Sequence, residues 1–169
     1  KRLKNYRYED GTIYHWNIGR PNSAGVITNW RPSDWNNPYF EAYENLNNDN
    51  RDRFFGDVGL TYQVLPELKL SGFVRSDMFT QNIEGRVAAG GRNPDAAYSI
   101  GKYQNREMNY EFLAQYTKDW NDFSLNLNVG ANLFDRDYTY LSQETRGGLT
   151  SPGFYNIEGS RERPVVSSY

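Results

Sequence analysis

The sequence predicts an all-β protein, a fragment of an antiparallel transmembrane β-barrel with about four long strands in two hairpins plus long external loops. Three observations lead to this prediction. Within residues 51–145, four segments alternate apolar and polar residues with a period of two, as strands do when their two faces lie in different surroundings. These segments are longer than the ~5–6 residues usual in soluble strands. Very short turns also alternate with long polar loops, which is typical of outer-membrane barrels.

The clearest of the four segments covers residues 123–133. Its apolar face consists of Phe123, Leu125, Leu127, Val129, Ala131 and Leu133, and its polar face of Ser124, Asn126, Asn128, Gly130 and Asn132. The apolar face carries no charge for about eleven positions, close to the ~9–11 residues with which a tilted strand crosses a bilayer. We therefore expect Leu125, Leu127, Val129 and Ala131 to face lipid and the asparagines to face the interior.

The other segments repeat this arrangement, so we expect strands near residues 52–64, 68–80, 106–118 and 123–140. Charged residues within the alternating segments fall on the polar face. The residues predicted to face the barrel lumen are Asp57, Lys69, Arg75, Asp77, Glu111, Asn126 and Asn128. Alternation by itself fits equally well an antiparallel sheet with one face on a soluble core and the other in water.

The connections between the segments differ in length and favour the membrane interpretation. Residues 65–67 and 119–122 form tight turns, which we expect on the periplasmic side, whereas residues 80–107 and 135–169 are long external connections. Aromatic residues gather near the segment ends, as in the two interfacial girdles of membrane barrels. These residues are Tyr62, Tyr116, Trp120 and Phe123 near the turns, and Phe79, Phe134, Tyr138 and Tyr140 near the loops.

The composition excludes several classes of protein. The chain has 169 residues, a formal charge of −2 and no cysteine, so it offers neither disulfides nor thiolate metal sites. There is no basic stripe for nucleic acid, and no stretch approaches the ~18 apolar residues of a transmembrane helix. Four strands cannot close even a small barrel of ~8 strands. We therefore expect this chain to be part of a larger protein.

The chain divides into three parts by this interpretation. Residues 1–50 are a long extracellular loop, residues 51–145 are two transmembrane hairpins of a larger barrel, and residues 146–169 are an extracellular loop that leads to the next strand. Aromatic residues of the first loop are candidates for binding a substrate or a partner, because large rings dominate recognition surfaces. They are Trp16, Trp30, Trp35, Tyr39 and Phe40. The alternative is that these rings pack the loop against itself or against a partner protein.

No arrangement of residues indicates catalysis, a metal site or a bound cofactor. His15 is the only histidine, so a histidine-centred triad or zinc cluster would need partners that the chain does not supply. The oxygen-rich run that begins at Asn45 fails the EF-hand pattern, because Asn50 and Gly56 stand where glycine and glutamate are needed. We therefore predict that the protein is not an enzyme.

Several short motifs follow one another in order along the chain. NPYF at residues 37–40 precedes YEN at 43–45 and DRFFG at 52–56, and LKLSG follows at 68–72. The later motifs are YTKD at 116–119, FSLN at 123–126, PGFYN at 152–156 and RP at 163–164. This ordered series covers nearly the whole chain and resembles the SusC/RagA-like family of TonB-dependent outer-membrane transporters.

The resemblance implies a 22-stranded barrel in the outer membrane of Bacteroidota, with an N-terminal plug and energy supplied through TonB. It also implies a SusD-like surface lipoprotein as partner, and glycan (oligosaccharide) or peptide substrates. The plug and the TonB-contacting segment would lie outside this chain. Two other interpretations remain open at this stage: a soluble all-β glycan-binding module with the aromatic loop as its platform, and a fragment of a β-rich glycoside hydrolase with a convergent carboxylate pair.

Overall fold

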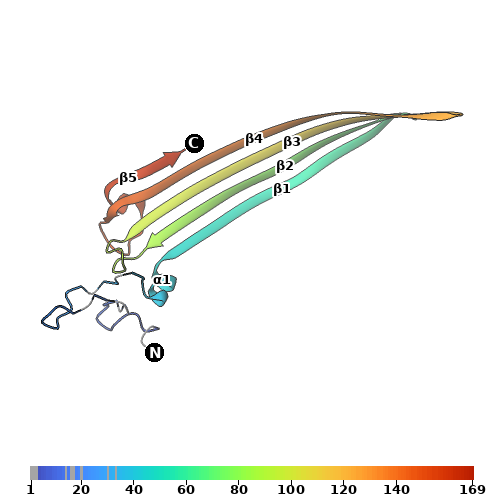
Figure 1. Cartoon of the computed structure of the whole chain (residues 1–169). Coiled ribbons are helices and arrows are strands. Elements are labelled where there is room, and N and C mark those ends of the chain that lie inside the picture. The colour runs from blue at the N-terminus through green and yellow to red at the C-terminus, as the bar shows by residue number, and fades with distance from the viewer. Residues whose placement is uncertain (1–3, 14, 16–17, 20, 30, 33) are drawn as a thin grey trace. The chain divides into compact units, whose positions relative to one another are not determined.

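Five strands form one antiparallel sheet in chain order, so each strand lies beside the one before it (Figure 1). The strands are β1 (Leu46–Leu65), β2 (Leu68–Val87), β3 (Ala97–Trp120), β4 (Phe123–Leu149) and β5 (Ser160–Ser168), and a short helix α1 (Pro38–Glu44) precedes them. This computed structural model describes residues 4–13, 15, 18, 19, 21–29, 31, 32 and 34–169. The predicted all-β antiparallel class is confirmed.

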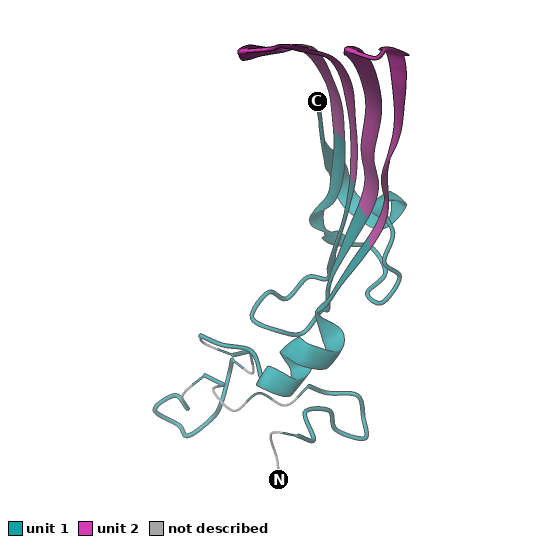
Figure 2. Ribbon diagram, turned by 90° about the vertical axis from the view of Figure 1, so that its right-hand side faces the viewer, with its two compact units in different colours: residues 1–50, 82–102, 140–169 teal, residues 51–81, 103–139 magenta. Residues whose placement is uncertain are grey.

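The chain forms two compact units (Figure 2). Unit 1 comprises Lys1–Asn50, Asn82–Lys102 and Tyr140–Tyr169, and unit 2 comprises Arg51–Gln81 and Tyr103–Thr139. Among the described residues, the buried hydrophobic side chains are Phe40, Ala88, Ala96 and Leu149, and all of them belong to unit 1. Unit 2 is therefore a single layer of sheet, and what covers its two faces decides its stability.

The strands are longer than the sequence predicts. Strands β2 and β3 run to Val87 and from Ala97, so the connection between them is residues 88–96 rather than a loop over most of 80–107. Beyond residue 80 the face of β2 that is apolar nearer the turn carries Asn82, Glu84 and Arg86, while Ile83 and Val87 lie on the other face, and residues 97–105 show no clear alternation. The backbone ladder does not need that alternation, because its bonds join N–H and C=O groups. The sheet therefore continues where the sequence pattern ends.

The segment after β4 also differs from the prediction of a loop. Strand β5 pairs antiparallel with the end of β4, with Leu141 opposite Ser168 and Leu149 opposite Ser160. The register shifts between Glu144 and Leu149, where Gly147 and Gly148 both adopt positive φ. Such backbone suits glycine, which has no Cβ to clash. The sequence gives little sign of β5, because Val165 and Val166 are its only large apolar residues.

Helix α1 begins at a proline that follows a capping asparagine. The Asn37 side chain accepts a hydrogen bond from the Tyr39 backbone N–H at 2.9 Å, and Pro38 occupies the first turn. Asparagine at the N-cap and proline just inside a helix are both common start signals. The sequence predicts only irregular chain here, because seven residues are too few to show a helical period.

The tight turn between β1 and β2 is joined to the end of β3. The Thr117 backbone N–H donates to the Glu67 carbonyl at 2.8 Å, and the Lys118 ammonium donates to the Glu67 carboxylate at 2.6 Å. Gln63 adds a bond from its side-chain amide to the Leu65 carbonyl at 2.7 Å. These contacts fix the register between the first hairpin (β1 and β2) and the second hairpin (β3 and β4) at the turn end of unit 2.

A missing side chain at Gly59 makes room for the ring of Phe73 on the neighbouring strand. A Cβ at residue 59 would lie 2.5 Å from Cδ1 of Phe73, whereas a Cβ at Gly56 would meet nothing within 4 Å. We expect Gly59→Ala to lower the free energy of unfolding by about 1–3 kcal/mol through overpacking. Urea unfolding of the purified full-length protein, followed by tryptophan fluorescence, measures this.

The matched control is Gly56→Ala on the same strand, which should change stability by less than about 0.5 kcal/mol. In a Phe73→Ala background the cost of Gly59→Ala should largely disappear, because the two positions are in direct contact. Equal costs for Gly59→Ala with and without Phe73 would show that the ring does not occupy this space.

Candidate functional site

One face of unit 2 is apolar and uncharged over the middle of all four strands. Strand alternation places these residues on it: Phe54, Val58, Leu60, Tyr62 and Val64; Leu68, Leu70, Val74 and Met78; Met108, Tyr110, Phe112, Ala114 and Tyr116; Phe123, Leu125, Leu127, Val129, Ala131 and Leu133. Many of these side chains are exposed, Val58 by 76% and Leu60 by 75%. A contiguous apolar patch of this size is rare on a soluble protein.

Charged residues bound this apolar face at both ends. At the loop end Arg106 forms an ion pair with Asp135 at 3.4 Å, and Asp52 stands on the same face of β1. At the turn end Lys118 is the first charge on β3. The eleven residues from Phe54 to Val64 are joined by ten steps, which span about 34 Å at ~3.4 Å per residue. With a strand tilt of about 40° the uncharged band is about 26 Å tall, close to the ~25 Å band of outer-membrane barrels.

Aromatic rings mark the turn end of the band. Trp120 and Phe123 stack across the tight turn with ring centroids 4.9 Å apart, and both are exposed. Tyr62 and Tyr116 belong to the same face by alternation. The second predicted girdle, near the loops, is not found as expected, because Phe79 and Phe134 lie on the opposite, polar face. The guanidinium of Arg51 covers the Phe79 ring at 3.9 Å, and Phe134 lines a depression with Arg75 and Asp77.

The polar face of unit 2 carries a ladder of contacts between strands. Some of these contacts are ion pairs: Arg53 with Asp77 at 2.5 Å, Arg136 with Glu107 at 3.2 Å, and Arg75 with Glu111. Others join neutral side chains. Gln115 donates to Asn128 at 3.2 Å, Thr117 donates to Asn126 at 3.1 Å, and Asn132 donates to Asn109 at 3.1 Å. Exposed pairs of this kind contribute about 0.2–1 kcal/mol each.

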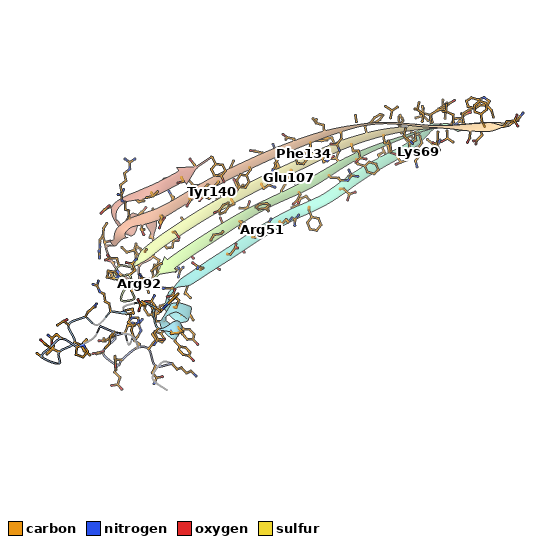
Figure 3. The ribbon with its side chains drawn as sticks, in the orientation of Figure 1. Arg51, Lys69, Arg92, Glu107, Phe134 and Tyr140 are labelled. Carbon is orange, nitrogen blue, oxygen red and sulfur yellow. The ribbon has the colours of Figure 1, made fainter. Side chains whose placement is uncertain are left out.

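The seven residues predicted to face the lumen all lie on this polar face by alternation. Five of them, Arg75, Asp77, Glu111, Asn126 and Asn128, belong to the ladder. Asp57 and Lys69 stand on the same face of the first hairpin, and Figure 3 labels Lys69 on β2. The ladder's other members are Arg53, Glu107, Asn109, Gln115, Thr117, Asn132 and Arg136. The alternation already places Asn109, Gln115, Thr117 and Asn132 on the polar face, whereas Arg53, Glu107 and Arg136 are not among the residues predicted to face the lumen, although their positions follow the same period of two.

The aromatic residues of the first fifty positions have different surroundings. Trp35 is 74% exposed and Tyr39 is 36% exposed, whereas Phe40 is fully buried. Phe40 packs edge-on against the His15 ring, with centroids 5.5 Å apart, and therefore belongs to the interior of unit 1. Trp16 and Trp30 lie outside the described residues. Trp35 lines a cavity of about 590 Å³ together with Asp34, Asn36, Pro38, Glu41 and Arg92.

His15 joins three distant parts of unit 1. Its Nδ1 accepts a hydrogen bond from the Asn37 backbone N–H at 3.2 Å, and its Nε2 lies 2.9 Å from the Gly90 carbonyl oxygen. These two contacts together require a neutral ring with its proton on Nε2. His15 is buried, and it holds the start of α1 beside the connection between β2 and β3.

A second polar cluster in unit 1 joins β2, β3 and the segment before β5. Arg86 donates to both carboxylate oxygens of Glu84, at 2.9 and 3.1 Å, and its guanidinium stands over the Tyr155 ring. A hydrogen bond from Tyr98 lowers the pKa of Glu84. Burial raises the pKa of Tyr98 and of Tyr155. This cluster orders the connection between β4 and β5 and offers no arrangement for acid–base chemistry.

Among the described residues, no three histidine, cysteine, aspartate or glutamate side chains gather as metal ligands would. No helix in the described part of the chain is both long and apolar enough to span a membrane. Comparison of the sequence with protein-family models and with curated proteins found no match to either.

The His15 contacts yield a testable consequence for unit 1. His15→Leu leaves the buried Asn37 N–H without its acceptor, which should cost about 1–3 kcal/mol of local stability. Hydrogen exchange at the backbone amides of α1 should therefore become about tenfold faster or more, because local opening controls exchange.

Val26→Ala is the control, since Val26 is 55% exposed and its replacement should leave exchange in α1 unchanged. Unaltered α1 exchange in the His15→Leu protein would mean that the histidine bonds do not hold the helix in place.

Proposed function

We propose that this chain is a wall segment of an outer-membrane β-barrel importer, a SusC/RagA-like TonB-dependent transporter. One observation carries the proposal. Unit 2 is a single-layer sheet whose apolar face is uncharged for about eleven residues per strand and is bounded by charges, while its other face is a hydrogen-bonded polar ladder. Lipid on one side and a polar interior on the other is the environment that suits both faces.

A soluble glycan-binding module accounts less well for the apolar face. A soluble sheet buries its apolar face against a second layer of structure. In unit 2 the apolar side chains are instead exposed, for example Phe54 by 70% and Leu133 by 65%. Exposing apolar surface to water costs ~25 cal/mol of free energy per Å². For a face of this size, that cost is far larger than the stabilisation that the side-chain contacts of the polar face contribute. A lipid contact removes this cost without a second layer.

The remainder of the proposal rests on the order of sequence motifs. Substrate, a glycan or a peptide, is captured at the loop end of the barrel beneath a SusD-like lipoprotein. TonB then drives its passage inward through a plug that is not part of this chain. The chain itself contributes wall strands and external loops and no catalytic group. Within the described loop residues, Trp35 is the exposed ring that is best placed to touch either the lipoprotein or the substrate.

Two neighbouring residues of β4 test the assignment of the faces. Leu127, on the apolar face, is 52% exposed, and Asn126, on the polar face, bonds to Thr117. In the full-length protein, Leu127→Arg should lower stability in the membrane by about 2–4 kcal/mol if residue 127 lies near the midplane. Asn126→Arg should lower it by about 1 kcal/mol or less, since only one polar contact is lost.

The measurement is urea unfolding of the full-length protein refolded into phospholipid vesicles. Equal costs for the two arginine variants, or a larger cost for Asn126→Arg, would contradict the assignment of lipid to the apolar face. A protein that stays monomeric and folded in buffer without detergent would favour the soluble module.

The orientation of the wall can be tested on whole cells. The connection at residues 88–96 lies outside the cell in this proposal, and Arg92 within it is exposed. Externally added proteinase K, which needs no basic residue at the cleaved bond, should therefore cut within residues 88–96 and leave the turn at Pro66 intact, because exposed loops are the preferred sites of cleavage. Cells with a permeabilised outer membrane are the control for access to the turn. Cleavage beside Pro66 in intact cells would reverse the topology.

A further inference from the structure

Two segments of unit 1 form the walls of the cavity that Trp35 lines, which we call the Trp35 cavity. The first wall is the start of α1 with the chain just before it, and it contributes Trp35, Pro38 and Glu41. The second wall is the connection at residues 88–96, which contributes Arg92, labelled in Figure 3. The long strands β1 and β2 separate the two walls in the sequence, so tertiary contacts must hold the walls together.

Two asparagine side chains provide links between the walls. The Arg92 backbone N–H donates to Asn36 Oδ1 at 2.7 Å, and the Ala88 backbone N–H donates to Asn45 Oδ1 at 2.8 Å. Carboxamide side chains carry no charge at any ordinary pH, so these two links do not change when the solution becomes acidic.

His15 provides a third link, and its ring can do so only while it is neutral. Its Nδ1 accepts the Asn37 backbone N–H at 3.2 Å on the first wall, and its Nε2 lies 2.9 Å from the Gly90 carbonyl oxygen on the second wall. A second proton on the ring would occupy Nδ1 and place two hydrogen-bond donors face to face. The side chain is only 2% exposed, so water cannot readily solvate the new charge. Protonation of His15 therefore breaks its bond to the first wall.

No carboxylate among the described residues contacts His15 to compensate for a positive charge. Its hydrogen bonds and ring contact there involve the backbone groups of Asn37 and Gly90 and the ring of Phe40. The tyrosines nearby change charge only in alkaline solution. The charged residues of the segments that meet at His15 are exposed to water, which screens them, or belong to an ion pair. They are Lys4, Arg7, Glu9, Asp10, Arg31, Asp34, Glu41, Glu44, Arg92 and Asp95.

We infer that His15 is an acid-sensitive latch between the two walls of the Trp35 cavity, closed while its ring is neutral and open once the ring is protonated. Histidine ordinarily changes charge between about pH 5 and 8. The latch therefore contributes stability above that range and loses it as the pH falls through it. Opening releases Asn37, the N-cap residue of α1, from the connection at Gly90. The links of Asn36 and Asn45 remain, so the change is a local opening of the cavity. The latch acts within unit 1, whatever surrounds unit 2.

Hydrogen exchange of the full-length protein at about pH 8 and about pH 5 tests the latch. Exchange is expressed as a protection factor, which removes the intrinsic effect of pH on amide exchange. In the wild-type protein we expect the protection of the α1 amides to fall about tenfold or more at the lower pH, because local opening controls exchange. The Thr117 N–H in unit 2, which bonds to the Glu67 carbonyl, should keep its protection at both pH values.

Two variants, His15→Gln and His15→Leu, remove the titrating group. Glutamine retains an N–H donor for Gly90, whereas leucine retains no polar group, and neither residue changes charge. We expect each variant to show the same α1 protection at both pH values, and the wild-type protein at the lower pH to approach the His15→Leu value. Equal α1 protection of the wild-type protein at both pH values would overturn the latch. So would an equal fall in the variants, which would assign the sensitivity to another group, or a matching fall at Thr117, which would show a global loss of stability.

Discussion

The alternation of side chains across a single layer of strands is the constraint on which the rest of unit 2 depends. Each residue of a strand can point to only one of two faces, so every polar contact on one side fixes an apolar residue on the other. The bond between Thr117 and Asn126 thereby commits Tyr116 and Leu127 to the opposite face. Because unit 2 lacks a second layer, stability must come from whatever meets its two faces. A shift by one residue would exchange the two environments throughout.

The sequence predicts the middle of the sheet well and its ends poorly, for a physical reason. Where one face is apolar and the other polar, as in β4 from Phe123 to Leu133, the period of two is visible in the residues. Beyond Thr80 in β2 the formerly apolar face carries Asn82, Glu84 and Arg86, and the backbone ladder continues although the side-chain pattern of the middle of the strand has ended. Strand β5 and helix α1 are short, so their periodicity has no room to appear, although Asn37 and Pro38 are a recognisable start for the helix.

In the candidate site, too, residues whose face follows from local strand spacing can be predicted, whereas residues placed by contacts far away in the sequence cannot. The seven predicted lumen residues share one face because their spacing alone determines this. Phe79 and Phe134 do not join a girdle on the apolar face, because nearness to a strand end does not decide the face on which a side chain lies. The role of His15 could not be predicted, since its partners Asn37 and Gly90 are 22 and 75 residues away in the chain. Phe40 is buried through the same distant contacts.

The short turns of unit 2 have a consequence for how the protein folds. Every strand neighbours its predecessor in the chain, and the first two hairpins close through turns of only two residues, Pro66–Glu67 and Asn121–Asp122. Chains with such local contacts lose little entropy on loop closure and form hairpins within about 1–10 μs. The contact of Glu67 with Lys118 then helps to set the register in which the second hairpin joins the first. Sheet growth can therefore proceed one hairpin at a time, in the order of synthesis.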